Sequence, residues 1–463
     1  MRLKRVTIST STVVISLCII YLLLGLGPYM GRVYVSGQTR DAFYMGNFFS
    51  EETGTERVML LETPQEAFYH RVNLISNAQY EILFSTFAFH SGVTSDVIVG
   101  ALLHAAERGV RIHMLNNAVV GQMHLRYRNA LVGHENINVY LFNRLNPFRP
   151  RYINSAMHCK YMIVDGKLLV LGGRNIGDKY YTPECFTGHV SLDREVLVYS
   201  QTTGGIISDV HRYFGVKIAS DNSSIARRTR RASRWEAERD YFIAAYLAHQ
   251  NSISDFDYYA ATVAANRITL VANNLGTIKN DSIVAYNLMR MAMASDVVIA
   301  QSPYVAFTRR NLNRFIEVAG GRDFTLLTNS IASTPNLPSF SNYHVNRHRL
   351  ASAGIAIYEF QSTSESLHGK TYLFDGRLTA IGSFNLNERS IRSDTEIMLV
   401  IDSIEFHNIT LAAIQYQMAG SLRVGADNRY IECEYVEIAH TGWLKRASYR
   451  VAGHLLRPLR FMF

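Results

Sequence analysis

A duplicated motif constrains the fold of this chain more than any other feature of its sequence. In the first copy, His158-Cys159-Lys160 is followed by four residues and then Asp165. In the second copy, His368-Gly369-Lys370 is followed by four residues and then Asp375. Two copies at one spacing predict a duplicated folding unit whose active site forms where the copies meet.

The sequence around the motifs repeats in the same order. Before the first motif we expect a helix, a strand, a helix and two strands, at residues 66–77, 80–89, 95–108, 110–115 and 137–142. Before the second motif the same order is expected at residues 282–294, 296–301, 308–318, 323–328 and 355–360. We therefore predict an α/β fold of two pseudo-symmetric halves, each a mixed, mostly parallel sheet flanked by helices.

The two residues that begin each motif suit phosphate chemistry. In an extended strand, a histidine and a lysine two positions apart project to the same face and can reach one phosphate. A neutral histidine can attack phosphorus to give a phosphohistidine, while a second, protonated histidine gives its proton to the leaving oxygen. One motif from each half would supply one histidine of each kind.

Each motif leads, after six further residues, into a glycine-containing turn, Gly172-Gly173-Arg174-Asn175 in the first half and Gly382-Ser383-Phe384-Asn385 in the second. Glycine lets the backbone approach a ligand closely, and each asparagine offers an amide donor to a phosphate oxygen. Downstream lie Asp193-Arg194-Glu195 and Asp394-Thr395-Glu396. A carboxylate there can hold the second ring nitrogen of a histidine, and we expect Glu195 and Glu396 to do so.

Two other interpretations of the motifs need to be weighed. A single copy could be a buried histidine beside a local lysine–aspartate ion pair, but a matched pair of copies argues against this. Histidine and aspartate are also metal ligands, yet the neighbouring lysine cation would repel a metal ion. We predict a site without a metal or another cofactor.

The N-terminal region, residues 1–40, predicts a membrane anchor. A basic start precedes an apolar run at residues 13–26, and the bulky residues that follow do not favour a cleavable signal peptide. Flanking charges favour a cytoplasmic N-terminus with the catalytic body outside, although Arg32 and Arg40 weaken that asymmetry. The expected location is a membrane, through a single-pass anchor.

The remaining boundaries follow from composition. We assign residues 41–215 to the first half, 216–280 to a basic linker or insertion, 281–425 to the second half and 426–463 to a basic, aromatic tail. The tail suits either a membrane interface or a helix packed on the core. The net charge of +9 favours an anionic partner. The four cysteines form no CxxC pair, so their spacing does not suggest a zinc module.

The paired motifs resemble the HKD motifs of the phospholipase D superfamily, and the resemblance runs from about Leu60 to Asp402. The segments at residues 172–178, 328–334 and 382–386 resemble bacterial cardiolipin synthases, especially their C-type branch. One departure is Gly173, which stands where the commonest pattern of the superfamily has a serine, as Ser383 does in the second copy. A hydroxyl contact in the first half would be lost.

The resemblance implies two phospholipase D-like halves and a two-step transfer. A phosphatidyl group moves to His158, or to His368 if the roles are reversed, and the other histidine acts as the general acid. Lys160, Lys370, Asn175 and Asn385 would hold the phosphate, with Ser383 beside them. Asp165 and Asp375 would support the architecture of the motifs.

The resemblance also implies a phospholipid substrate, with phosphatidylglycerol expected, at the anionic surface of a bacterial cell membrane. An alcohol acceptor on a second lipid would give cardiolipin, whereas water would give phosphatidate and make the protein a hydrolytic phospholipase D. A nuclease acting on nucleic acid shares the chemistry, but no aromatic-rich strand surface for stacking bases is evident. We expect neither a nucleic-acid partner nor an obligatory protein partner, and intact motifs argue against a catalytically silent scaffold.

Overall fold

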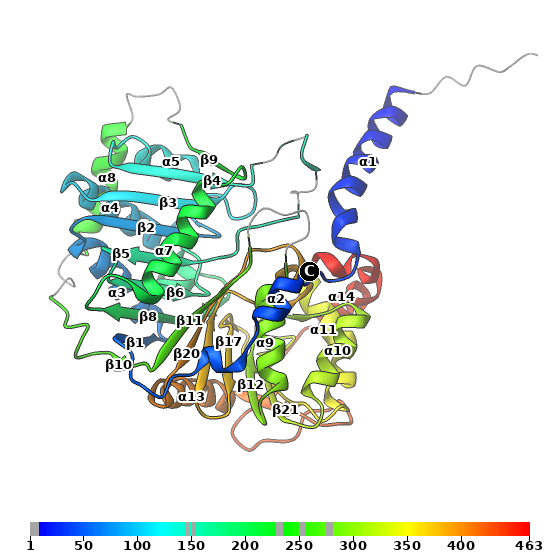
Figure 1. Cartoon of the computed structure of the whole chain (residues 1–463). Coiled ribbons are helices and arrows are strands. Elements are labelled where there is room, and N and C mark those ends of the chain that lie inside the picture. Colours follow the sequence, from blue (N-terminus) through cyan, green and yellow to red (C-terminus); the bar gives the residue numbers. More distant parts are fainter. Residues whose placement is uncertain are drawn as a thin grey trace, which may run out of the picture.

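The computed structural model describes residues 9–144, 146, 148–150, 154–227, 235–249, 255–274 and 281–463. Two β-sheets, one from each half of the chain, form the centre of the molecule (Figure 1). Of the basic cluster in the expected linker, Arg228, Arg230, Arg231 and Arg234 lie outside the described residues.

Nine strands of the described chain form the first sheet, in the order β10-β1-β8-β6-β5-β2-β3-β4-β9. In chain order these strands are β1 Glu56–Leu61, β2 Glu81–Thr86, β3 Arg111–Asn117, β4 Ile137–Phe142, β5 Tyr161–Val164, β6 Leu168–Gly172, β8 Glu195–Ser200, β9 Ser223–Ile225 and β10 Val263–Ala264.

Eight strands, counted over the same described residues, form the second sheet in the order β11-β20-β18-β17-β12-β14-β15-β21. They are β11 Arg267–Ala272, β12 Val297–Gln301, β14 Asp323–Asn329, β15 Ala356–Phe360, β17 Thr371–Phe374, β18 Leu378–Gly382, β20 Ile397–Asp402 and β21 Ser421–Val424. From β1 to β4 and from β11 to β15 the two sheets have the same order, which confirms the predicted duplication.

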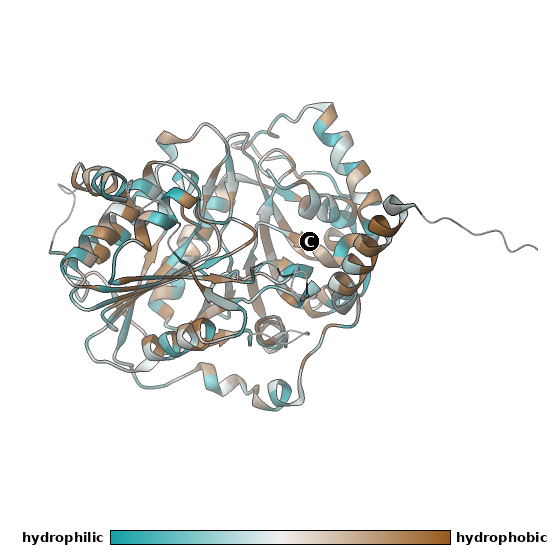
Figure 2. Cartoon of the chain, turned by 90° about the horizontal axis from the view of Figure 1, so that it is seen from above, coloured by the Kyte–Doolittle hydropathy of each residue, from teal (hydrophilic) through white to brown (hydrophobic). Residues whose placement is uncertain are grey.

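Helices pack on both sheets and bury their apolar strands, which appear as brown ribbons in Figure 2. The first half carries α3 Pro64–Asn77, α4 Val93–Glu107, α5 Leu125–Leu131, α6 Asp178–Tyr181, α7 Gly205–Ile218 and α8 Trp235–Leu247. The second half carries α9 Ile283–Met293, α10 Arg309–Ala319, α11 Leu337–Ala351, α12 Glu388–Arg392 and α13 Ile404–Ala419. A further core, which includes side chains of α7, joins residues of both sheets.

The expectation of mostly parallel sheets is wrong. Parallel pairing is confined to β2-β3-β4 and β12-β14-β15 within the two large sheets, and their other pairs are antiparallel. The motif strands β5 and β17 each return directly through a tight turn, and a turn of this length can join only antiparallel strands. Asp165 and Gly166 in the first turn, like Asp375 and Gly376 in the second, have positive φ angles.

Residues 216–280 were expected to form a linker, but their described parts pack on the two halves. Helix α8 packs on α4, where Gly100 has no room for a side chain because the carbonyl of Phe242 approaches it. Strand β10 pairs with β1 in the first sheet, and β11 pairs with β20 in the second. These segments are structural parts of the two halves.

Helix α1, Thr10–Met30, projects from the body of the molecule (Figure 1). Many of its aliphatic side chains are exposed, among them Val14, Leu17 and Leu23. Among the residues that the structure describes, no helix has the combination of length and apolar character needed to cross a membrane.

The C-terminal tail contains α14, Trp443–Leu455, which packs on α11. Tyr449 is buried, and its ring lies 5.5 Å from that of Phe340. Trp443 and Leu455 on the same helix are exposed. The packed helix, one of the two expected states of the tail, is therefore present.

Candidate active site

The two motif histidines lie at the interface between the halves, and each is held by a carboxylate from the opposite half. In the first motif, Nδ1 of His158 lies 3.1 Å from both carboxylate oxygens of Glu396. The backbone N–H of His158 donates to the carbonyl of Thr395 at 3.1 Å. Glu396 therefore occupies the orienting position expected for it.

The second histidine has the mirror arrangement, with a different partner from the one expected. Nδ1 of His368 lies 2.5 Å from Oδ2 of Asp193, and its backbone N–H donates to the carbonyl of Leu192 at 2.6 Å. Short strands β7 (Val190–Leu192) and β16 (Glu365–Leu367) pair in parallel and bring these segments together.

The expectation that Glu195 orients a histidine is wrong. Its carboxylate is buried and accepts hydrogen bonds from Arg71 at 3.0 and 3.1 Å, with Arg174 3.6 Å away. Strand register explains the difference. Glu195 lies opposite Gly172 in β6, whereas the residue opposite Gly382 in β18 is Met398. Glu396 lies two positions before Met398, and Asp193 lies two positions before Glu195, so Glu396 corresponds to Asp193. Aligning the two Asp-x-Glu sequences directly therefore pairs the wrong residues, by two positions.

The two motif lysines are buried beside the histidines. Nζ of Lys160 donates to the carbonyl of His158 at 2.5 Å and lies 5.1 Å from the centre of the Phe87 ring. Nζ of Lys370 lies 2.8 Å from Nδ1 of His368. Burial and the Lys370 cation lower the pKa of Lys160 to about 7, and burial lowers the pKa of Lys370 to about 8. An anion between them would restore the charged form of both lysines.

The histidines are neutral near pH 7 in the free protein. Burial lowers the pKa of His158, although Glu396 acts in the opposite direction. Burial and Lys370 lower the pKa of His368 to about 3. Burial alone would raise the pKa of Asp193, but Lys370 and His368 hold it well below its ordinary value. A neutral histidine whose Nδ1–H donates to a carboxylate presents Nε2 as a nucleophile.

The two asparagines expected to bind phosphate differ in their surroundings. Oδ1 of Asn175 accepts from the backbone of Ala88 at 3.2 Å, and its Nδ2 donates to Tyr180 at 3.0 Å. Oδ1 of Asn385 is buried and has no hydrogen-bond partner among the described residues. The amide of Asn385 is therefore the freer of the two to turn toward a ligand.

The Gly173 departure from the superfamily pattern has a structural cause. In the second half, the hydroxyl of Ser383 donates to Glu396, which also accepts from Ser390 at 2.6 Å. In the first half, a side chain at position 173 would overlap the carboxylate of Asp193. Glycine gives the shorter acid the room to reach its histidine.

Asp165 and Asp375 lie in the turns that follow the motif strands and do not contact either histidine. Asp165 accepts hydrogen bonds from the backbone N–H groups of Gln79, Tyr80 and Glu81 at 2.7–2.9 Å. Asp375 accepts from the N–H groups at the start of β12 at 2.9 and 3.0 Å. Both fix the start of the neighbouring strand, as an architectural role requires.

Several neighbours of the site were not among the expected residues. The ring of Tyr180 lies 5.4 Å from that of His368, and the ring of Phe87 lies 5.0 Å from that of His158. Buried Arg194 crosses the interface to Gln301 at 2.5 Å and pairs with Glu62 at 2.6 Å. Arg194 lies inside the Asp193-Arg194-Glu195 segment, but nothing in the sequence marks its partners. Among the residues described, no cluster of three His, Cys, Asp or Glu side chains is placed to hold a metal ion.

Two like halves that each bring one His-x-Lys-x4-Asp motif to a shared site match the paired HKD motifs of the phospholipase D superfamily. The family model described as "Cardiolipin synthase, PLD-like domain" matches residues 72–215 and 288–415, and the chain belongs to this family. Among similar proteins is cardiolipin synthase C of Escherichia coli, 28% identical over 76% of this chain and 83% of that protein. An uncharacterized protein of Helicobacter pylori is 27% identical over 77% of this chain and 78% of its own length.

A solved structure has the same fold. The phosphatidylserine synthase of Haemophilus influenzae superimposes with a TM-score of 0.63 over 88% of this chain and 95% of that one, at 13% identity. The agreement extends over both halves.

Proposed function

We propose that this protein is a phospholipid-modifying enzyme that transfers a phosphatidyl group through a phosphohistidine, and that it makes cardiolipin from phosphatidylglycerol. The observation that carries the proposal is the pair of histidines held from opposite halves with two buried lysines beside them. Such a site needs one anionic phosphate to stabilise the lysine charges, and it presents two histidines to that phosphate. The similarity to cardiolipin synthase C favours a phospholipid over other phosphodiesters.

In the proposed reaction, Nε2 of neutral His158 attacks phosphorus, and the phosphatidyl group is bonded to His158 as the headgroup alcohol leaves. Binding of the anionic phosphodiester favours the protonated form of His368, and this imidazolium gives its Nε2 proton to the leaving oxygen and becomes neutral. In the second step, neutral His368 takes a proton from the hydroxyl of the acceptor lipid, whose oxygen displaces His158. Glu396 and Asp193 hold the two rings in place, and the two lysines stabilise the charge on the phosphoryl oxygens.

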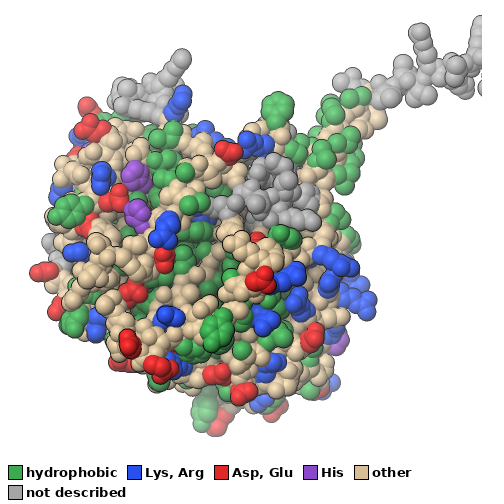
Figure 3. All heavy atoms as spheres, viewed as in Figure 1, with side chains coloured by type: hydrophobic (Ala, Val, Ile, Leu, Met, Phe, Trp, Pro, Cys, Tyr) green, Lys and Arg blue, Asp and Glu red, His purple; other side chains and the backbone are tan. Residues whose placement is uncertain are grey.

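We further propose that α1 attaches the protein to the membrane that contains its substrate. The exposed aliphatic side chains of α1 suit a lipid environment. Lys and Arg side chains gather on the face that carries α10 and α14 (Figure 3), and this face suits anionic headgroups. The catalytic body is proposed to lie outside the cytoplasm.

The test is to incubate the detergent-purified protein with phosphatidylglycerol labelled in its acyl chains, with a chelator present, and to separate the lipid products. Cardiolipin with release of glycerol is the expected result. Phosphatidate alone would identify a hydrolytic phospholipase D, and absence of any lipid product would contradict the proposal. The His158→Ala protein serves as the control for contaminating activity.

A further inference from the structure

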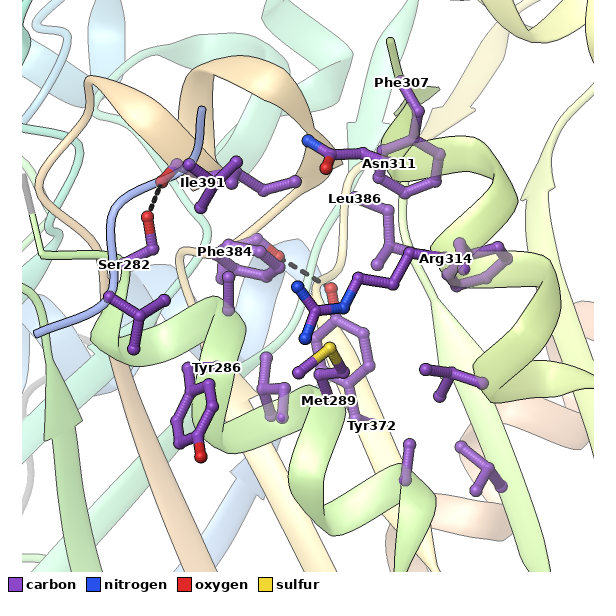
Figure 4. Close-up of a pocket in the computed structure, with 18 of the residues that line it drawn as sticks. Ser282, Tyr286, Met289, Phe307, Asn311, Arg314, Tyr372, Phe384, Leu386 and Ile391 are labelled. Atoms are coloured by element: carbon purple, nitrogen blue, oxygen red, sulfur yellow. Dashed lines mark hydrogen bonds between the residues drawn. The ribbon is translucent and has the colours of Figure 1, made fainter. Parts of the chain in front are cut away.

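A cavity of about 130 Å³ lies in the second half. Its walls come from α9 and α10, its floor from β12, β14 and β17, and one end from the loop that follows the second motif (Figure 4). Val33 and Val35, in the segment that leads away from α1, complete the lining.

The cavity is lined mainly by apolar side chains, and three of its polar side chains are hydrogen-bonded within the protein. The hydroxyl of Tyr372 donates to the carbonyl of Phe384 at 3.0 Å, and that of Ser282 donates to Ile391 at 2.5 Å (Figure 4). Nδ2 of Asn311 donates to Glu388 at 2.7 Å. A ligand inside therefore meets mainly aliphatic and aromatic side chains, which suits hydrocarbon.

Arg314 is the one charged side chain among the described residues that line the cavity. It is exposed, extends from α10 across the cavity toward Met289 on α9 (Figure 4), and has no ion-pair partner among the described residues. A guanidinium at the mouth of an apolar cavity matches a ligand with a hydrocarbon body and a phosphate at one end.

The cavity is separate from the catalytic site. Phe384 lies between Ser383 and Asn385 in sequence, and its ring and Tyr372 close the end of the cavity nearest the second motif. The hydrogen bond from Tyr372 to the Phe384 carbonyl fixes this wall. A lipid whose chain enters here places its phosphate at Arg314, not at Lys160 and Lys370.

We propose that this cavity binds one acyl chain of an anionic phospholipid other than the molecule that reacts, with its phosphate at Arg314. The segment of Val33 and Val35 joins the cavity to α1, so the mouth lies near the proposed membrane attachment. The proposal shares with the proposed function only the contact with lipid. Binding here is measured without turnover, so the two can fail separately.

The experiment uses the full-length His158→Ala protein in detergent, with phosphatidylglycerol that carries a photoactivatable diazirine near the end of one acyl chain. After irradiation, labelled residues are located by mass spectrometry. We expect adducts on α9 and α10 at residues that line the cavity. Ala285→Phe, which fills the space, is expected to reduce them at least about tenfold, and Arg314→Gln several-fold.

Arg310→Gln is the matched control, because Arg310 is exposed on the same helix and does not line the cavity. Its labelling is expected to equal that of the parent protein. If Ala285→Phe does not fold, Val35→Phe fills the same space from a segment outside the helices. Adducts confined to α1 or the catalytic site, or cavity labelling unchanged in the folded filling variant, would overturn the proposal.

Discussion

Gly173 and Asp193 occupy adjacent space, so that a side chain on the first would displace the carboxylate of the second. Asp193 is the residue that holds His368. Gly173 therefore helps to orient His368, which lies in the other half of the chain.

Replacement of Gly173 by alanine is expected to lower kcat/KM at least about tenfold, which corresponds to about 1.4 kcal/mol of transition-state stabilisation. The reason is displacement of Asp193 from His368. Steady-state assays of lipid turnover measure the effect. Gly215→Ala, in open space on α7, is the control and should retain full activity. Full activity in Gly173→Ala would contradict the proposed displacement.

Substitution of Asp193 is expected to affect mainly activity, whereas substitution of Glu195 is expected to affect mainly stability. Asp193→Asn should lower kcat about 10–100-fold at a smaller cost in stability, because it disturbs the orientation of His368 and removes a counter-charge from Lys370. Glu195→Gln should instead lower the free energy of unfolding by about 3–5 kcal/mol, because Arg71 and Arg174 lose their buried counter-charge. Urea denaturation and activity of the residual folded protein separate the two. Equal effects on stability would show that this division is incorrect.

Substrate affinity should fall as pH rises through about 7 to 8. Lys160 and Lys370 have pKa values of about 7 and 8 in the free protein, so they lose charge in this range and bind an anionic phosphodiester less well. A rise in KM across this range checks the prediction. Lys160→Arg, which stays charged, should shift the rise to higher pH.

Lys160 and Lys370 also determine the direction in which the free energy of unfolding changes with pH. Burial lowers their pKa values, so the unfolded chain binds more protons than the folded protein between about pH 7 and the ordinary lysine pKa of about 10.4. Their contribution to the free energy of unfolding therefore rises with pH in this window. Unfolding curves of the wild type and of Lys160→Met at pH 7 and 9 measure this contribution. If the free energy of unfolding of the wild type rises no more between these pH values than that of the variant, the prediction is contradicted.

Asp165→Ala is expected to destabilise the protein by about 1–3 kcal/mol while the remaining folded protein keeps near-normal kcat. Three backbone N–H groups at the start of β2 lose their acceptor, but no reacting group is touched. Thermal unfolding and assays below the melting range provide the measurement. A large loss of kcat in folded protein would assign Asp165 to the chemistry.

Much of this site could be predicted because motif spacing is local. The matched His-x-Lys pairs identified the histidines and lysines, and the repeat identified two halves. The choice between Asp193 and Glu195 could not be made, because it depends on which residue of β8 lies opposite Gly172 across the sheet. The direction of the motif hairpins was missed for a similar reason: helix–strand alternation indicates layers but does not determine the direction of each strand pair.

The cavity was also beyond prediction. It joins residues from the segment after α1, two helices and the loop after the second motif, and these are distant in sequence. Arg314 belongs to an amphipathic helix whose charged residues are ordinarily only a solvated face. Only the packing of α9 against α10 places that side chain over an apolar space.

The central claim is that the phosphatidyl group is transferred through His158. The most direct test is to mix the His368→Ala protein with a phosphatidyl ester of p-nitrophenol, whose leaving group needs no proton from His368, quench under alkaline conditions that preserve phosphohistidine, and map the adduct by mass spectrometry. A phosphatidyl group on His158, absent from the His158→Ala protein, is the predicted result. An adduct on another residue, or wild-type turnover of lipid by the His158→Ala protein, would contradict the claim.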